Sequence, residues 1–77
     1  MKNCEENVIK YLPKRYHKYI VWAEKSHNSC DNSNVYFLTI EVNGKEYHAE
    51  PSDTIKELKW NFKEVIKEVE EDQKIIL

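Results

Sequence analysis

The sequence predicts an α+β fold in which a helix, three strands and a second helix follow one another, with a three-stranded antiparallel sheet packed against an amphipathic C-terminal helix. Asn43-Gly44 separates two runs of alternating apolar residues, 35–42 and 45–50, which is the strongest short-range signal for a tight β-hairpin. An apolar stripe with helical spacing occupies the C-terminal third. The chain has 77 residues, enough for one small core. We therefore expect a single domain over residues 1–77.

The N-terminal third predicts a short helix, a strand and a loop. Asn3 and Glu6 have the spacing of a capping box, and Pro13 ends the helix that they would begin. Residues 16–23 are rich in β-branched and aromatic side chains, which predicts the first strand. Residues 26–34 are small and polar throughout and predict a mobile loop. The apolar residues of the helix are Cys4, Val8, Tyr11 and Leu12.

The Asn-Gly turn fixes the register of the predicted hairpin. With the turn at residues 43 and 44, Ile40 lies opposite Tyr47, and the Leu38–Ala49 pair shares their face. This face is expected to be core. The opposite, solvated face carries the pairs Thr39–His48 and Glu41–Glu46.

The C-terminal helix is predicted to cover this sheet. Its N-cap is Ser52, Asp53 or Thr54, the last forming a capping box with Glu57. Fraying is expected over residues 72–77. The apolar stripe consists of Ile55, Leu58, Phe62, Val65, Ile66 and Val69.

The composition favours a cytoplasmic protein whose partner is another protein. Residues 1–25 carry six Lys/Arg against three Glu, and residues 26–77 carry six Lys against eleven Asp/Glu, for an overall charge of -2. A phosphate-binding domain is normally more basic. The chain has no predicted membrane span or signal peptide. Cys4, facing the core, and Cys30, in the loop, are therefore expected to be free thiols.

No residue pattern predicts catalysis, a metal site or a cofactor. His27-x-x-Cys30 is the one closely spaced pair of metal-ligand types, whereas zinc sites usually have two such pairs. The same pair, in a loop without glycine, forms no oxyanion hole. The remaining histidines, His17 and His48, are distant in sequence. We therefore predict a protein that is not an enzyme.

Three features are candidates for contact sites. Trp60 lies across the helix from the apolar stripe, where it binds a partner, covers neighbouring lysine stems or folds against the N-terminal helix. Residues 68–72 place four acids at a helix end that prefers cations, which favours a partner or a solvated charged face. The outer sheet face carries Val35 and Phe37, joined by either Ile20 with Trp22 or Tyr19 with Val21. It is either exposed as an aromatic patch or covered by the N-terminal helix or residues 75–77.

Two families share parts of this pattern. The element order resembles the double-stranded RNA-binding domain, but residues 52–57 read Ser-Asp-Thr-Ile-Lys-Glu where that family has a basic motif. Residues 49–57, followed by Val65-Ile66, look like the last strand and helix of HicB-type antitoxins. The latter resemblance, over residues 18–71, implies a small sheet and helix that bind a toxin.

A third resemblance is to small phage-encoded anti-CRISPR inhibitors. It covers residues 6–69 as a pattern of helix, strand, Ser/Asn/Asp loop, Asn-Gly-Lys-Glu-Tyr hairpin and amphipathic helix. The resemblance implies a phage or mobile-element protein whose carboxylates occupy the basic nucleic-acid groove of a host defence nuclease. The predicted partner-binding residues are Glu41, Glu46, His48, Glu50, Trp60, Glu64, Glu68 and Glu71.

Direct nucleic-acid binding is the alternative from a different class. It would use base stacking on exposed aromatic residues together with the basic N-terminal third. A homodimer through the same exposed sheet face is a further alternative. The predicted nucleic-acid-binding residues are Lys14, Arg15, Lys18, Trp22 and Phe37.

Overall fold

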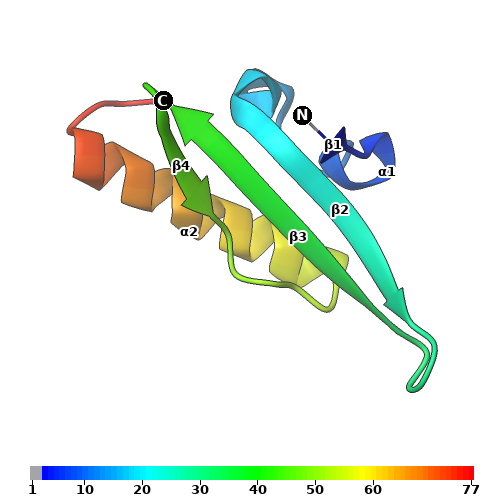
Figure 1. The fold of residues 1–77 in the computed structure, drawn as a ribbon. Coiled ribbons are helices and arrows are strands. Elements are labelled where there is room, and N and C mark those ends of the chain that lie inside the picture. Colours follow the sequence, from blue (N-terminus) through cyan, green and yellow to red (C-terminus); the bar gives the residue numbers. More distant parts are fainter. Residues whose placement is uncertain (1–2) are drawn as a thin grey trace.

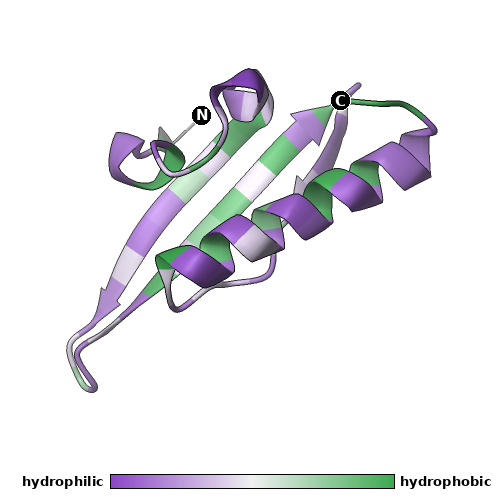
Figure 2. Cartoon of the chain, turned by 180° about the vertical axis from the view of Figure 1, so that it is seen from behind, coloured by the Kyte–Doolittle hydropathy of each residue, from purple (hydrophilic) through white to green (hydrophobic). Residues whose placement is uncertain are grey.

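The computed structural model describes residues 3–77 and shows a sheet with all helical segments on one of its faces (Figure 1). Seen from behind, α2 and the N-terminal helical segments lie in front of the strands (Figure 2). The predicted α+β arrangement is confirmed. The elements are β1 (Asn3–Cys4), α1 (Glu6–Ile9), the 3-10 helix η1 (Lys14–Tyr19), β2 (Ile20–Asn28), β3 (Ser33–Val42), β4 (Lys45–His48) and α2 (Ile55–Gln73).

The strands lie in the order β1-β2-β3-β4, and the predicted antiparallel pairs β2–β3 and β3–β4 are both present. The two-residue β1 adds a short parallel pairing with β2 that the sequence analysis missed. The chain stays extended beside β2 as far as Glu5, whose N–H donates to the carbonyl of Ala23 at 3.0 Å. Helix α1 therefore begins at Glu6 with Glu5 as N-cap, and the predicted capping box of Asn3 and Glu6 is wrong.

The β3–β4 hairpin has the predicted register. Ile40 pairs with Tyr47, and the turn residues Asn43 and Gly44 have φ values of 53° and 83°, as a type I′ turn requires. Ile40 and Tyr47 are buried beneath α2, whereas Glu41 and its partner Glu46 are exposed on the other face.

Two predictions for the N-terminal half are wrong. The strand predicted over 16–23 begins only at Ile20, because residues 14–19 form η1 directly after Pro13. This helical turn buries Tyr16 edge-on against Phe62, with ring centroids 5.6 Å apart. The aromatic residue that suggested a strand is therefore a core residue of η1.

The predicted loop over 26–34 is also wrong. Strands β2 and β3 stay paired through this segment, residues 26–35, which we call the arm, and only residues 29–32 form its turn. His27 Nδ1 and Asn34 Oδ1 are joined across the arm at 3.0 Å. At the turn, the Asp31 carboxylate accepts hydrogen bonds from the N–H and hydroxyl of Ser33 at 3.1 and 2.6 Å. Local side-chain hydrogen bonds thus order a segment whose composition is typical of a loop.

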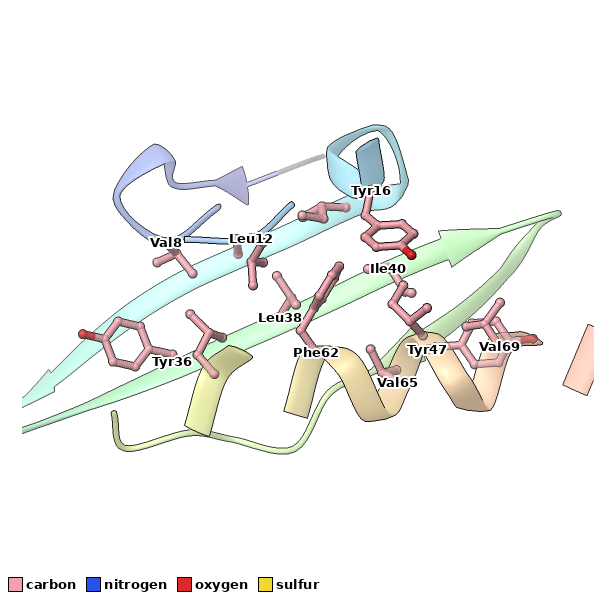
Figure 3. Close-up of a cluster of buried hydrophobic side chains, with 14 of the residues drawn as sticks. Val8, Leu12, Tyr16, Tyr36, Leu38, Ile40, Tyr47, Phe62, Val65 and Val69 are labelled. Carbon is pink, nitrogen blue, oxygen red and sulfur yellow. The ribbon is translucent and has the colours of Figure 1, made fainter. Parts of the chain in front are cut away.

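The core lies between the sheet and the helical layer (Figure 3). The N-terminal segment contributes Val8, Leu12 and Tyr16, and α2 contributes the predicted stripe, with Ile55 half-buried at its start. Both helical segments therefore contribute to one core. Its sheet residues are Ile20, Ala23, Tyr36, Leu38, Ile40, Val42 and Tyr47.

Both ends of α2 are held by hydrogen bonds. At the start, the N-cap is Thr54, one of the three predicted candidates. Its hydroxyl accepts the N–H of Glu57 at 3.1 Å, as in the predicted capping box. At the end, the Ile75 N–H donates to the carbonyl of Glu70, and the Leu77 N–H donates to the Glu70 carboxylate. These bonds hold much of the segment for which fraying is predicted. Within residues 3–77, no helix combines the length and apolar character needed to span a bilayer.

Candidate protein-binding surface

A bulge in β2 determines what the outer sheet face presents. Ile20 pairs with Ile40, but Trp22 pairs with Thr39, so Val21 is an extra residue between the two pairs. Val21 and Trp22 consequently line the same outer hollow, while Ile20 lies in the core. The sequence predicts one of two strict alternations for this strand, and the bulge replaces both.

The outer face is not covered by either candidate segment. The N-terminal helical residues and residues 75–77 both pack on the opposite, helical side. Trp22 and Phe37 remain 38% exposed in an open hollow of about 640 Å³. Thr39 lies between Trp22 and His48 in the cross-strand row, and a 2.8 Å hydrogen bond joins Thr39 Oγ1 to His48 Nδ1. The aromatic patch is therefore a feature of the free surface.

Carboxylates on three strands border this hollow. Glu24 lies opposite Phe37 on β2, and Glu41 and Glu46 form a cross-strand pair of like charge on the hairpin. No lysine or arginine of residues 3–77 lines the hollow. Its apolar centre therefore lies in a negative local field.

A second hollow of about 410 Å³ continues the first, because His48 and Ala49 line both. It lies between the connection after β4 and one side of α2. Lys67 is the single cation that lines it within the described chain. The carboxylates that line it are those of Glu50, Glu64, Glu68 and Glu71.

Hydrogen bonds position Glu50 beside α2. Asn61 Nδ2 donates to the hydroxyl of Ser52 at 2.9 Å and to the Glu50 carbonyl at 3.3 Å. Ser52 is fully buried, and its backbone exchanges two hydrogen bonds with Tyr36, of 2.8 and 3.1 Å. The connection is thus fixed to both the sheet and the helix. We call the joined surface the acidic surface: Glu24, Glu41, Glu46, His48, Glu50, Glu64, Glu68 and Glu71.

The structure brings together all the predicted partner-binding residues except Trp60. Trp60 is 62% exposed on α2, where it shares a shallow hollow with Lys56, Lys59 and Lys63. Sequence reasoning missed Glu24, whose position opposite Phe37 depends on the β2 bulge and on the pairing of the arm. A strand extended beyond residue 23 in the sequence analysis would have revealed it.

The predicted nucleic-acid-binding residues are divided between two faces. Trp22 and Phe37 lie on the outer sheet face, whereas Arg15 lines a groove between η1 and α2 on the helical side. Lys14 and Lys18 are exposed on η1. The basic residues therefore do not surround the aromatic patch.

The thiols and imidazoles occupy separate places. Cys4 and Cys30 are free thiols; Cys4 is half-buried, and Cys30 is exposed on the arm turn. His17 Nε2 is hydrogen-bonded to the Leu12 carbonyl at 2.8 Å, while His27 bonds within the arm. Within residues 3–77, no three His, Cys, Asp or Glu side chains are placed to hold one metal ion.

Comparisons with protein-family models, with curated proteins and with solved structures find no match for this chain.

Proposed function

We propose that this protein is a small non-enzymatic inhibitor or regulator that binds another protein through the acidic surface. One observation carries the proposal: carboxylates from the hairpin, from the β4–α2 connection and from α2 border the exposed aromatic pair Trp22 and Phe37 or the adjoining hollow. An uncovered sheet face with aromatic side chains at its centre and charged groups around it has the composition of a protein interface.

The charge of this surface indicates the chemistry of the partner. Aromatic anchors supply most of the contact energy in such interfaces, and the surrounding charges determine the association rate and the choice of partner. The carboxylates of the acidic surface are complementary in charge to a partner surface rich in Lys and Arg. A nucleic-acid-binding effector has such a groove, in agreement with the resemblance to phage-encoded inhibitors, so we propose competition with nucleic acid for that groove.

The same charges disfavour the alternatives. A nucleic-acid strand stacked on Trp22 and Phe37 would place its phosphates beside Glu24, Glu41 and Glu46. A homodimer formed face to face would place two copies of those carboxylates against each other. No geometric feature of the described chain favours the antitoxin alternative over the inhibitor.

The proposal predicts that charge reversal on the acidic surface abolishes partner capture. Glu46→Lys combined with Glu68→Lys changes both hollows and leaves the core intact. Partner retention should fall about tenfold or more, because two favourable charge contacts become repulsive. The measurement is immobilised-protein capture from cells, with quantitative mass spectrometry, followed by titration with the purified partner and a labelled oligonucleotide that the partner binds.

The matched control combines Glu6→Lys with Asp53→Lys, which makes the same charge change at exposed positions outside the acidic surface. This control should retain the partner, and wild type should displace the oligonucleotide from it. Equal retention by both double variants would contradict the proposal. Direct, strongly salt-dependent oligonucleotide binding that is lost in the triple variant Lys14→Glu, Arg15→Glu, Lys18→Glu would support the nucleic-acid alternative instead.

A further inference from the structure

We propose that the groove between η1 and α2 is a second binding site, and that it takes an acidic amphipathic peptide segment of a partner protein. The groove lies on the helical layer, away from the outer sheet face that bears the aromatic patch. Its charge is opposite to that of the acidic surface. The inference does not depend on the proposed function, because no residue that defines the acidic surface lines the groove and the ligand has the opposite charge.

Four cations line this groove on two walls. On α2, Lys59, Lys63 and Lys67 recur every four residues, which places them about 6 Å apart along the helix. On the other wall, the Arg15 guanidinium carbon lies 4.6 Å from the centroid of the Tyr16 ring, and an Arg15 Nη atom donates to the Tyr16 hydroxyl at 2.7 Å. Stacking and this hydrogen bond hold Arg15 in place and reduce the entropy that it loses when it binds an anion.

These cations have no carboxylate partner within the described chain. The one ion pair found in residues 3–77 joins Lys45 to Asp72, on the hairpin side of α2. Among the described residues, Glu70 contributes the single acidic side chain that lines the groove, and its carboxylate already accepts the N–H of Leu77 at 3.0 Å. The groove therefore presents a net positive charge that an acidic ligand would neutralise.

The groove also has an apolar lining. Leu12, Phe62 and Ile66 contribute to it, and Ile76 is 93% exposed at its edge. Its volume of about 800 Å³ lies within the roughly 300–1,000 Å³ range of ligand sites. A ligand that fills it must carry apolar side chains together with its negative charge.

These two requirements fit an acidic amphipathic helix better than a nucleic acid. The lysine row from Lys59 to Lys67 is about 12 Å long, or two helical turns, so it can face acids spaced every three to four residues on such a ligand. Nucleic-acid strands need accessible aromatic faces for stacking. Among the described residues that line the groove, Tyr16 and Phe62 are buried edge-on to each other. Tyr11, which is 38% exposed, is the single accessible ring, so successive bases would lack a second ring on which to stack.

The test is fluorescence anisotropy with a dye-labelled synthetic peptide of roughly 15 residues, with leucine at i, i+3, i+4 and i+7 and glutamate elsewhere. We expect saturable binding that the variant combining Lys59→Glu with Lys63→Glu weakens about tenfold or more. The control is Lys56→Glu, a single charge reversal at an exposed lysine of α2 that does not line the groove. It should bind with nearly the wild-type Kd, and thermal melts should show that both variants are folded.

Further probes separate this site from the acidic surface and from simple charge attraction. The variant combining Glu46→Lys with Glu68→Lys should bind the probe peptide as wild type does, even if it fails to capture a basic partner. A peptide with serine in place of leucine should bind at least tenfold more weakly. The proposal is overturned if the glutamate-leucine peptide shows no saturable binding, if the serine peptide or a single-stranded oligonucleotide binds equally well, or if Lys56→Glu weakens binding as much as the double variant.

Discussion

At the scale of single residues, Asp72 connects the hairpin to the end of α2. Its Oδ2 atom accepts hydrogen bonds from Lys45 Nζ at 2.8 Å and from the Tyr47 hydroxyl at 2.6 Å. Beside it, the Gln73 amide donates to the Val42 carbonyl at 2.8 Å. The hydrogen bond from Lys45, followed by that from Tyr47, lowers the pKa of Asp72 below its usual value. One of the acids at the unfavourable end of the helix therefore has a structural role, which sequence spacing alone did not predict.

The lowered pKa predicts how the contribution of Asp72 varies with pH. Because the folded-state pKa of this carboxyl is below the unfolded-state value, its stabilisation is present at neutral pH and is lost as the pH falls through the folded-state pKa. Asp72→Asn should therefore unfold at a lower urea concentration than wild type at about pH 7, and the two midpoints should converge as the pH falls below the folded-state pKa. Urea titrations followed by circular dichroism measure both midpoints.

Glu71→Gln is the control for this prediction, because it removes an equal charge from the same helical turn, and none of the hydrogen bonds found within residues 3–77 uses the Glu71 side chain. We expect the neutral-pH midpoint of Glu71→Gln to lie closer to that of wild type than that of Asp72→Asn does. Equal losses in the two variants would assign the effect to the net charge of α2 and not to the contacts with Lys45 and Tyr47.

At the scale of elements, local signals predicted the hairpin and α2 but not the arm or η1. Asn43-Gly44 requires positive φ at both positions, so one dipeptide specified the β3–β4 register. The arm instead depends on pairing between residues of low strand propensity and on turn hydrogen bonds made by Asp31. In η1, burial of Tyr16 against Phe62 overrides the strand preference of the local sequence.

Gly44 gives the hairpin a test at this scale. A Cβ atom added at Gly44 would have no atom within 4 Å, so only the positive φ of 83° opposes a side chain. Gly44→Ala should therefore destabilise the protein by about 1 kcal/mol through backbone strain alone. Gly44→Val should cost more than Gly44→Ala, because a β-branched side chain fits this conformation less well. Chemical denaturation of each variant gives the free energies of unfolding.

The control for Gly44→Ala is a chemically synthesised chain with D-alanine at position 44. D-alanine adds the same methyl group but favours positive φ, so this chain should be at least as stable as wild type. Similar destabilisation by both forms of alanine would show that the methyl group, and not the backbone conformation, disturbs the turn. Partner capture by the D-alanine chain should also equal that of wild type.

At the scale of the whole molecule, charge is segregated between surfaces, with carboxylates around the outer sheet face and along one side of α2, and cations in the groove. The acidic residues of the hairpin and of α2 were candidates because the resemblance to phage-encoded inhibitors implies carboxylates that enter a basic groove. Sequence alone could not show that Glu50 and Glu64 line one hollow between the β4–α2 connection and α2, an arrangement that depends on Ser52 bonding to Asn61 and Tyr36. The helical patterns also do not show whether both helical segments pack on the same face of the sheet, because that arrangement depends on tertiary contacts.

The arm extends past the helical layer as a paired ribbon (Figure 1), which predicts an uneven distribution of local stability. Strands β2 and β3 each continue from the core into the arm, so the hydrogen bonds between them run from a buried region into an exposed one. The boundary should lie at Tyr36, whose N–H donates to the Ser52 carbonyl at 2.8 Å and whose side chain is buried. Beyond it, His27 and Asn34 pair in an exposed region without a covering helix.

Amide hydrogen exchange followed by NMR tests this prediction within one molecule. Hydrogen-bonded amides of residues 26–28 and 33–35 should exchange roughly a hundredfold or more faster than those of residues 38–40. The arm can open without exposing the core, whereas exchange at residues 38–40 requires disruption of α2 packing. A chain in which Gly-Asn replaces residues 27–34 provides the control: it should leave the exchange of residues 38–40 nearly unchanged. Equal protection along the whole ladder, or loss of core protection in the shortened chain, would mean that the arm and the core unfold as one cooperative unit.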